Sequence, residues 1–382
     1  EQFSEEAGAY GVPFAPLPGE FLALIDSPEG KAAIAGGRGF SAGVSLLKQV
    51  RPLIRRLLDR EWEVARAFAP DIILHHPKSL ASPNIAEKLG VPAMLASPLP
   101  GFTPTAAFPT PLLPFGSLGP LNRISHRLAI HGGAILFRKT VSAWRGEMLG
   151  LPARATSRAQ VAGTLYAYSP SIVPVPYDWG DDVKVSGNWF LDSGDWLPPP
   201  ALAQFLASGD PPIYVGFGSM PGLDPDRLSA IVIEALTKVG RRGLLATGGG
   251  ALAAGYAQSH VHIIDHAPHD RLFPHVAAAM HHGGAGTTAA SLRAGLPTII
   301  CPFFGDQPFW GRRVAALGVG PQPLDRKGLS VETVAAAFAK VAEEGMRCRA
   351  AALGQAIRRE MGVSDAIDFI IARSNAWRAR RL

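Results

Sequence analysis

The stretch HHGGAGTTAASLRAGLPTIICPFFGDQ, from His281 to Gln307, carries the pattern that decides the fold. An apolar strand is expected over 277–280, a loop of small residues over 281–286, and a helix over 287–294. The glycines of the loop let the main chain approach a ligand closely, and the positive end of a helix dipole favours an anion. We therefore predict a diphosphate site at this turn, although a tight connection also uses glycine where no ligand binds.

A second strand, expected over 296–301, leads into the segment PFFGDQPFW. Asp306 and Gln307 should then lie in a loop at the carboxyl edge of a parallel sheet, where open α/β sheets bind ligands. A carboxylate beside a carboxamide can accept from and donate to neighbouring hydroxyls of a sugar ring. The same pair elsewhere would be an ordinary solvated turn, but four aromatic residues flank this one.

Strand and helix patterns alternate along the rest of the chain, as a parallel α/β fold requires. The other expected strands lie over 71–75, 92–96, 243–247 and 261–265, and one more begins at Ile213. Ser82 is expected to cap the helix that follows the first of these strands. A proline-rich shift in composition over 188–212 indicates a linker between two domains.

Composition agrees with two globular domains of ordinary size. The chain has 382 residues, of which 47% are hydrophobic and 18% charged, so it can bury a sizeable core and shows no bias towards disorder. Its two cysteines are far apart and suit a reducing compartment. Since no run of residues reads as a signal peptide or a membrane span, the cytoplasm is the expected location.

The net charge of +6 raises the question of an anionic partner. One long helical segment sets an apolar stripe opposite five arginines, namely Arg51, Arg55, Arg56, Arg60 and Arg66. A solvated helix face is the ordinary interpretation, and peripheral contact with anionic lipid is the alternative. Nucleic acid is not expected, because no basic run is interleaved with aromatic residues.

The segment from Pro268 to Pro321 resembles the UDP-dependent glycosyltransferases, and within them the sterol 3-β-glucosyltransferase group. The resemblance extends to VGFGSM at 215–220, NWFLD at 188–192, YSPSIVPVPYDWG at 168–180 and TPTAAFPTP from Thr103, and so covers nearly the whole chain. It implies a GT-B fold, in which two Rossmann-like, doubly wound domains face each other across a cleft. The implied parts are an acceptor-binding domain over 1–200, a nucleotide-sugar-binding domain over 201–363, and a helix over 364–382 that crosses back to the first domain.

The resemblance also implies a donor site for a UDP-hexose, with glucose as the first choice. The implied phosphate contacts are Ser219, His282, Gly284, Ala285, Gly286 and Thr287. Asp306 and Gln307 would hold the sugar. The uracil ring would lie against His266, Ala267 and His269. Ala290 stands where plant relatives carry a ribose-binding glutamate, so the ribose contact must come from elsewhere.

The implied reaction is an inverting displacement, in which a base takes a proton from the acceptor hydroxyl as the UDP leaves. Donors at the start of the helix can meet the growing charge, so neither a metal nor a cofactor is expected. The acceptor would be a lipophilic alcohol such as a sterol, held by Phe102, Thr103, Phe108 and Phe115, unless their loop is only structural.

The catalytic base is unknown at this stage. The family's first strand and its base-bearing loop have no counterpart at the beginning of this chain, so the resemblance implies that a segment is missing there. His75 and His76, at the end of a predicted strand, are weak substitutes, and an ordinary pair of loop-edge histidines is the other interpretation. The missing segment also leaves open a nucleotide-sugar-binding module without catalysis.

Two other functions deserve comparison. The sequence GGGALA at 248–253 matches the dinucleotide fingerprint G-x-G-x-x-A, with Asp265 at the end of the next strand, so an NAD-dependent oxidoreductase is an alternative. Seven histidines lie between His260 and His282, but they lack the spacing and the cysteine partners of a zinc site.

Overall fold

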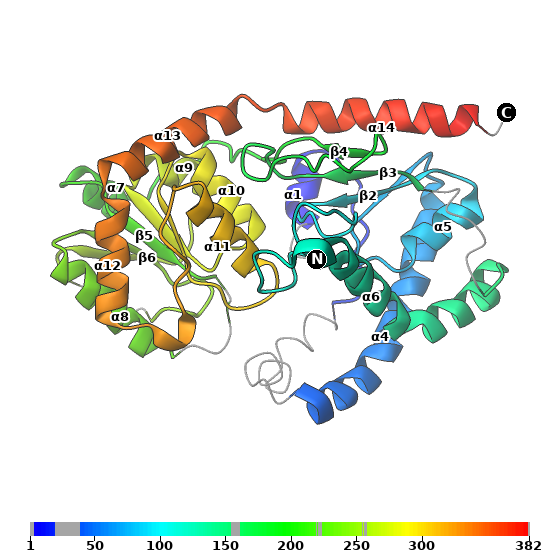
Figure 1. Ribbon diagram of the computed structural model, residues 1–382, viewed down its shortest axis with the longest axis horizontal. Helices are drawn as coiled ribbons and strands as arrows, with labels where there is room; N and C mark the ends of the chain where they lie inside the picture. Colours follow the sequence, from blue (N-terminus) through cyan, green and yellow to red (C-terminus); the bar gives the residue numbers. More distant parts are fainter. Residues whose placement is uncertain are drawn as a thin grey trace.

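The protein folds into two parallel β-sheets, each covered by helices, in two halves that lie beside each other (Figure 1). The computed structural model describes residues 4–19, 39–153, 161–218, 220, 224–253, 255 and 258–380. The predicted α/β class with parallel sheets is confirmed, since every strand pair in both sheets is parallel.

The N-terminal sheet has four strands in consecutive order. They are β1 (Ile73–His75), β2 (Ala93–Ser97), β3 (Val161–Tyr166) and β4 (Val183–Val185). The helical segments of this half are α1 (Ser4–Ala9), α4 (Gly39–Phe68), α5 (Ser82–Leu89), η1 (Gly119–Leu121), α6 (Asn122–Trp144) and η2 (Arg145–Leu149). Helices α4, α5 and α6 enclose a hydrophobic cluster that includes Leu58, Trp62, Ile85 and Trp144, which fixes α6 beside α4.

The C-terminal sheet has five strands in the order β7-β6-β5-β8-β9. They are β5 (Ile213–Gly216), β6 (Gly243–Ala246), β7 (Val261–Ile264), β8 (Ala278–His281) and β9 (Thr298–Ile300). The helical segments around them are α7 (Pro200–Ala207), α8 (Pro225–Lys238), α9 (His269–Leu272), η4 (Phe273–His275), α10 (Ala285–Arg293), α11 (Gln307–Ala316), η5 (Arg326–Gly328) and α12 (Val331–Val341). The strand order reverses between β5 and β8, and such a switch point opens a crevice at the carboxyl ends of the strands.

The switch-point turn is tighter than the sequence predicted. Strand β8 continues to His281 and helix α10 begins at Ala285, so the loop comprises only His282, Gly283 and Gly284. Gly283 has a φ of 91°, and a Cβ built on it would lie 2.6 Å from Ile300 Cγ2. Because a left-handed glycine reverses the chain within one residue, the predicted helix start at 287 was two residues late.

The prediction that Ser82 caps α5 is wrong. The N-cap position is Ala81, and the Ser82 hydroxyl instead donates to Glu61 Oε2 on α4 at 3.1 Å. Ser79 donates to the same oxygen at 2.5 Å. Burial raises the pKa of Glu61, so the two hydroxyls solvate a carboxylate that the core would otherwise leave without donors.

The two halves share a hydrophobic cluster in which Tyr166 and Tyr168 pack with Phe309 and Trp310. Two further helices connect the halves, α13 (Glu344–Arg358) and α14 (Gly362–Ala379), and α14 crosses over the N-terminal sheet (Figure 1). Arg373 Nε on α14 donates to the Ala162 carbonyl at 2.7 Å. Within the described ranges, none of the helices combines the length and apolar character that crossing a bilayer requires.

Candidate functional site

The loops after β5 and β8 meet at the switch point. Gly218, with a φ of 57°, brings the first loop close to the second, since a Cβ on it would lie 3.9 Å from His282 Cε1. The His282 ring makes a hydrogen bond to the Phe217 backbone. Its Nδ1 atom is buried and has no hydrogen-bond partner among the described residues. A polar atom in that state marks a place where a ligand can supply the missing partner. Ser219 lies outside the described residues.

Several groups tune the charge of His282. Burial lowers its pKa, while the carboxylate of Asp306 and the hydrogen bond to Phe217 act in the opposite direction. The imidazole therefore sits within electrostatic reach of Asp306, and an anion beside Nδ1 would favour the protonated ring.

His281 fixes the same loop by a hydrogen bond to its backbone, a role that the sequence does not predict. Its Nδ1 accepts from the Gly283 N–H at 3.0 Å, and its Nε2 lies 3.4 Å from Ser291 Oγ. Ser291 in turn contacts Thr298 Oγ1 at 3.1 Å, so the chain of hydrogen bonds reaches β9. Burial, with smaller contributions from His282 and His269, holds the pKa of His281 well below its usual value. The sequence alone does not distinguish His281, which is buried at the end of a strand, from the adjacent His282.

The start of α10 presents its first amides without a side-chain cap. The first backbone bond of the helix runs from Thr288 N to Gly284 O at 2.9 Å, so the N–H groups of Ala285, Gly286 and Thr287 precede the helical ladder. Gly286 is exposed, Thr287 is half-buried, and no atom lies within 4 Å of a Cβ built on Gly286. This arrangement can take an anionic oxygen next to His282.

Asp306 and Gln307 lie at the start of α11 rather than within a loop. Asp306 Oδ2 accepts from Trp310 Nε1 at 2.8 Å. Gln307 is 4% exposed, and its Oε1 accepts from the Phe303 N–H at 2.6 Å. Among the described residues, its Nε2 donates to the sulfur of Met220, which is a weak acceptor. Gln307 therefore shapes the turn after β9, and its amino group is the part that a sugar hydroxyl could recruit.

The three residues predicted to lie against the uracil ring take different positions. The His266 side chain is 87% exposed and pairs with Asp265 Oδ2 at 2.9 Å. His269 stacks on Phe273 with ring centroids 4.5 Å apart, so its face is already covered. Ala267 is half-buried between them. In this structure His269 is thus packed against a neighbouring ring, and His266 is an exposed side chain bound to Asp265.

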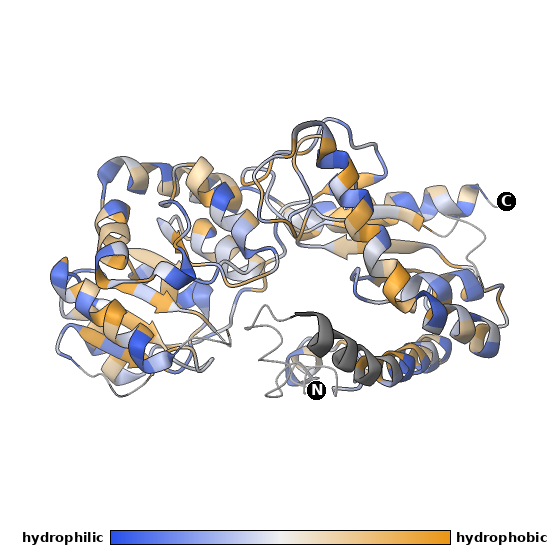
Figure 2. Cartoon of the chain, turned by 60° about the horizontal axis from the view of Figure 1, so that its bottom comes forward, coloured by the Kyte–Doolittle hydropathy of each residue, from blue (hydrophilic) through white to orange (hydrophobic). Residues whose placement is uncertain are grey.

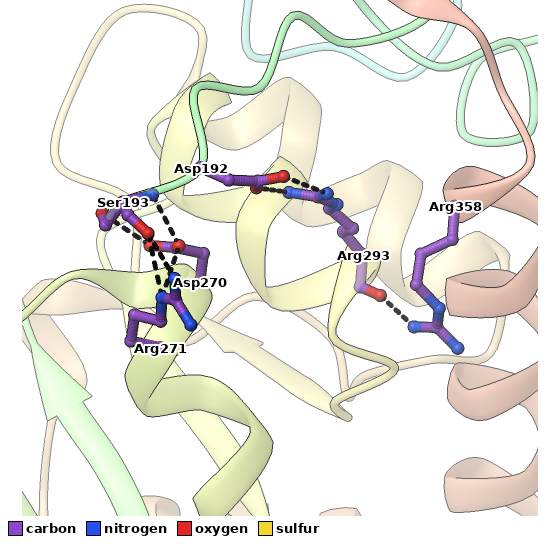
Figure 3. Close-up of polar contacts among 6 residues, drawn as sticks. All are labelled: Asp192, Ser193, Asp270, Arg271, Arg293 and Arg358. Atoms are coloured by element: carbon purple, nitrogen blue, oxygen red, sulfur yellow. Dashed lines mark hydrogen bonds and ion pairs between the residues drawn. The ribbon is translucent and has the colours of Figure 1, made fainter. Parts of the chain in front are cut away.

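A pocket of about 730 Å³ adjoins this segment and includes Pro268, His269 and Ala290. Residues 190–193 of the linker also line it. Figure 3 shows how Asp192 and Ser193 of the linker contact Asp270, Arg271 and Arg293. The linker is bound to α9 and α10: Ser193 N and Oγ donate to Asp270 at 2.8 and 2.9 Å, and Asp192 pairs with Arg293. No sequence spacing indicates this cluster, because the partners lie far apart along the chain.

A second pocket, of about 760 Å³, opens near the opposite ends of the same strands and is lined by Ile213, Ala278 and Pro297. Since parallel sheets bind ligands at their carboxyl ends, we assign the function to the edge that carries His282.

The predicted acceptor residues lie in the loop between β2 and α6. Phe102 and Phe108 pack into the cluster shared by the two halves, and Phe108 lies 5.8 Å from Phe309 between ring centroids. Thr103 Oγ1 accepts from the Tyr166 hydroxyl at 2.9 Å, and Phe115 is 52% exposed. Their part in holding an acceptor stays a prediction.

His75 and His76 lie at the carboxyl end of β1, an edge strand of its sheet. Burial lowers the pKa of His75, whose Nδ1 lies 3.3 Å from the His76 carbonyl oxygen. Burial also lowers the pKa of His76, whose Nδ1 accepts from the Lys78 N–H at 3.2 Å. Each imidazole is thus bound to its own loop.

The dinucleotide fingerprint lacks its structural context. In the described part of the connection between β6 and β7, no helix follows the glycines. Gly248 is instead needed for packing, because a Cβ on it would lie 2.6 Å from the Asp265 carbonyl oxygen. The oxidoreductase interpretation therefore loses the helix on which a pyrophosphate would rest.

Residues 254–366 match the family model described as Erythromycin biosynthesis protein CIII-like, C-terminal domain. Sterol 3-beta-glucosyltransferase UGT80A2 of Arabidopsis thaliana is 38% identical over 79% of this chain and 48% of its own length. The sterol 3-beta-glucosyltransferase of Aspergillus fumigatus is 37% identical over 97% of this chain and 27% of its own length. The chain therefore spans half the length or less of these two curated relatives.

Solved structures establish the fold. Calicheamicin glycosyltransferase CalG4 is 18% identical, with a TM-score of 0.63 over 97% of this chain and 88% of that one. Glycosyltransferase VinC, solved in complex with dTDP, is 16% identical, with a TM-score of 0.64 over 97% of this chain and 90% of that one. The predicted GT-B fold and the predicted resemblance are both confirmed: the chain is a GT-B protein related along nearly its whole length to the sterol 3-β-glucosyltransferases.

Proposed function

We propose that this protein transfers a hexose, with glucose as the first choice, from a UDP-sugar to a hydroxyl of a lipophilic acceptor such as a sterol. One observation carries the proposal: the unpartnered Nδ1 of His282 lies at the switch point of the sheet, beside the uncapped start of α10. The names of the curated relatives support the sterol and the glucose.

In the proposed reaction the acceptor oxygen attacks the anomeric carbon, and the bond from that carbon to the diphosphate breaks. The negative charge that develops on UDP would be met by His282 and by the amides of Ala285, Gly286 and Thr287, which are oriented before the reaction begins. Asp306 and the amino group of Gln307 would select the sugar. The acceptor proton must pass to a base that we do not assign, and no cofactor is proposed.

We further propose that the enzyme works in the cytoplasm, where its two cysteines stay reduced. Both thiols are free, Cys301 in the core and Cys348 at the surface. Burial raises the pKa of Cys301 to about 12, which suits a packing role rather than chemistry.

The test is a product assay with mass detection. The protein is incubated with UDP-glucose, UDP-galactose or dTDP-glucose, each against a panel of sterols, flavonoids and macrolides. Formation of a sterol glucoside from UDP-glucose supports the proposal in full. Product from dTDP-glucose alone would refute the nucleotide choice, which matters because VinC was solved with dTDP. Binding of UDP-glucose with no product on any acceptor would instead favour a nucleotide-sugar-binding module.

A further inference from the structure

One face of α6 exposes large apolar side chains to solvent. We define the α6 face by Leu121, directly before the helix, and by Ile124, Leu128, Ile135 and Leu136. Their exposed fractions range from 46% to 69%. Residues 121, 124, 128 and 135 follow helical spacing and form one stripe along the helix. Figure 2 shows hydrophobic bands along α6, at the surface of the N-terminal half.

The loop that leads into the helix continues this character. Leu112 is 51% exposed and Phe115 is 52% exposed. The apolar residues in the cores of the two sheets are buried, whereas those of the α6 face and of this loop are exposed. Several large apolar side chains exposed along one helix and its leading loop are more than the scattered exposure of an ordinary surface.

The charges beside the stripe are cationic and unneutralised. Arg127, Arg138 and Lys139 are exposed and make no ion pair or hydrogen bond with any residue that the structure describes. The chain contains no aspartate or glutamate between Glu87 and Glu147. A stripe of leucine and isoleucine flanked by free arginine and lysine is the pattern of a helix that lies in a membrane interface.

The arginines of α4, for which lipid contact was the sequence-based alternative, are arranged differently. Arg55 pairs with Asp59 and Glu147, and Arg60 pairs with Glu63. The Arg51 side chain lies outside the described residues. Acidic neighbours neutralise Arg55 and Arg60, and Arg66 lies over the Trp62 ring. Part of the positive charge of α4 is therefore cancelled, whereas the three cations beside the α6 face have no acidic partner among the described residues.

We propose that the α6 face docks this protein on the surface of a bilayer that contains anionic phospholipid. The apolar stripe enters the boundary between headgroups and acyl chains, and Arg127, Arg138 and Lys139 contact the phosphates. The cations beside the stripe favour anionic lipid as the occupant. Asp178 lies at the start of α6, where it pairs with Arg123, and it therefore leaves the three other cations of this face to the lipid phosphates. The inference does not depend on the chemistry proposed above, since it concerns binding alone.

The test is sedimentation with vesicles of phosphatidylcholine, with and without phosphatidylserine. The wild-type protein should bind the phosphatidylserine vesicles, and added salt should weaken that binding. Leu128→Glu/Ile135→Glu should lower the partition coefficient by about tenfold or more, since it removes apolar burial and adds anionic charge. Arg127→Gln/Arg138→Gln/Lys139→Gln should lose most of the preference for phosphatidylserine, and its exposed side chains leave the fold intact.

A matched control comes from α14, where Ile367 and Ile371 are 50% and 55% exposed. Ile367→Glu/Ile371→Glu should bind vesicles as the wild type does, and circular dichroism should show native helix content for every variant. Three results would each overturn the proposal: no binding of wild type to phosphatidylserine vesicles at low salt, unchanged binding of the α6 variants, or an equal loss in the α14 control.

Discussion

A methyl group placed at Gly284 tests whether His282 binds the diphosphate. The backbone at this position, with φ −61° and ψ 144°, accepts any residue. A Cβ there would lie 2.6 Å from His282 Nε2, and ordinary contact begins at 3.4 Å, so the ring must withdraw by about 0.8 Å. The hydrogen bond to Phe217 is then lost, at about 1 kcal/mol of stability. If the displaced ring no longer donates to a phosphate, the free energy of UDP binding should also weaken by about 1.5–3 kcal/mol.

Gly284→Ala should therefore bind UDP roughly tenfold to a hundredfold more weakly than wild type, while still folding. Isothermal titration calorimetry measures the affinity, and thermal unfolding measures the stability. Gly255→Ala is the matched control, because Gly255 has no atom within 4 Å of an added Cβ. If Gly284→Ala binds UDP within about twofold of wild type, His282 is not a phosphate contact.

Three further outcomes follow from the same geometry. Because burial keeps His282 neutral and Phe217 engages its other nitrogen, Nδ1 can donate to a phosphate only after the ring gains a proton, so UDP binding should take up a proton near neutral pH. Calorimetry in two buffers of different ionisation enthalpy measures this uptake, and identical enthalpies would contradict it. His281 has a folded pKa depressed below the unfolded value of about 6.5, so its contribution to stability is present above that pH and lost as pH falls towards the folded pKa. The urea-unfolding free energy should drop in this acid range, and His281→Asn should drop less; parallel curves would refute the assignment. On the linker, Asp192→Asn should change stability by less than about 1 kcal/mol, because that pair is exposed. Asp270→Ala should cost about 1–3 kcal/mol, since it leaves two linker donors unpaired; equal losses in thermal unfolding would contradict the difference.

The sequence predicted the fold well because the strands that decide it are short, apolar and buried. Strands β5 and β8 are buried at every position, and β6, β7 and β9 begin and end within two residues of their predicted bounds. The predicted linker over 188–212 lies between the strands of the two sheets. Its prolines cannot donate a hydrogen bond to a β-ladder, so they mark a break between the sheets.

Side-chain partners were beyond sequence reasoning. Ser82 looked like a helix cap, but Glu61 on another helix competes for its hydroxyl. Gln307 was expected to face a sugar, and its carboxamide oxygen instead accepts from the backbone at Phe303. In each case the deciding contact joins groups whose distance depends on tertiary packing, or on a turn geometry that residue type alone does not fix.

The exposure of α6 could not be predicted either. Both its exposed face and its buried face carry large apolar residues, so the sequence does not tell which of the two packs inside. Only the packing of Trp144 and Phe137 towards α4 shows which face is left outside.

The most direct measurement of the central claim is a crystal structure with UDP-glucose bound. We predict that the diphosphate lies within hydrogen-bonding distance of His282 Nδ1 and the amides of Ala285 to Thr287, with the hexose beside Asp306. A diphosphate bound instead in the pocket lined by Ile213 and Ala278, at the opposite ends of the strands, would contradict it.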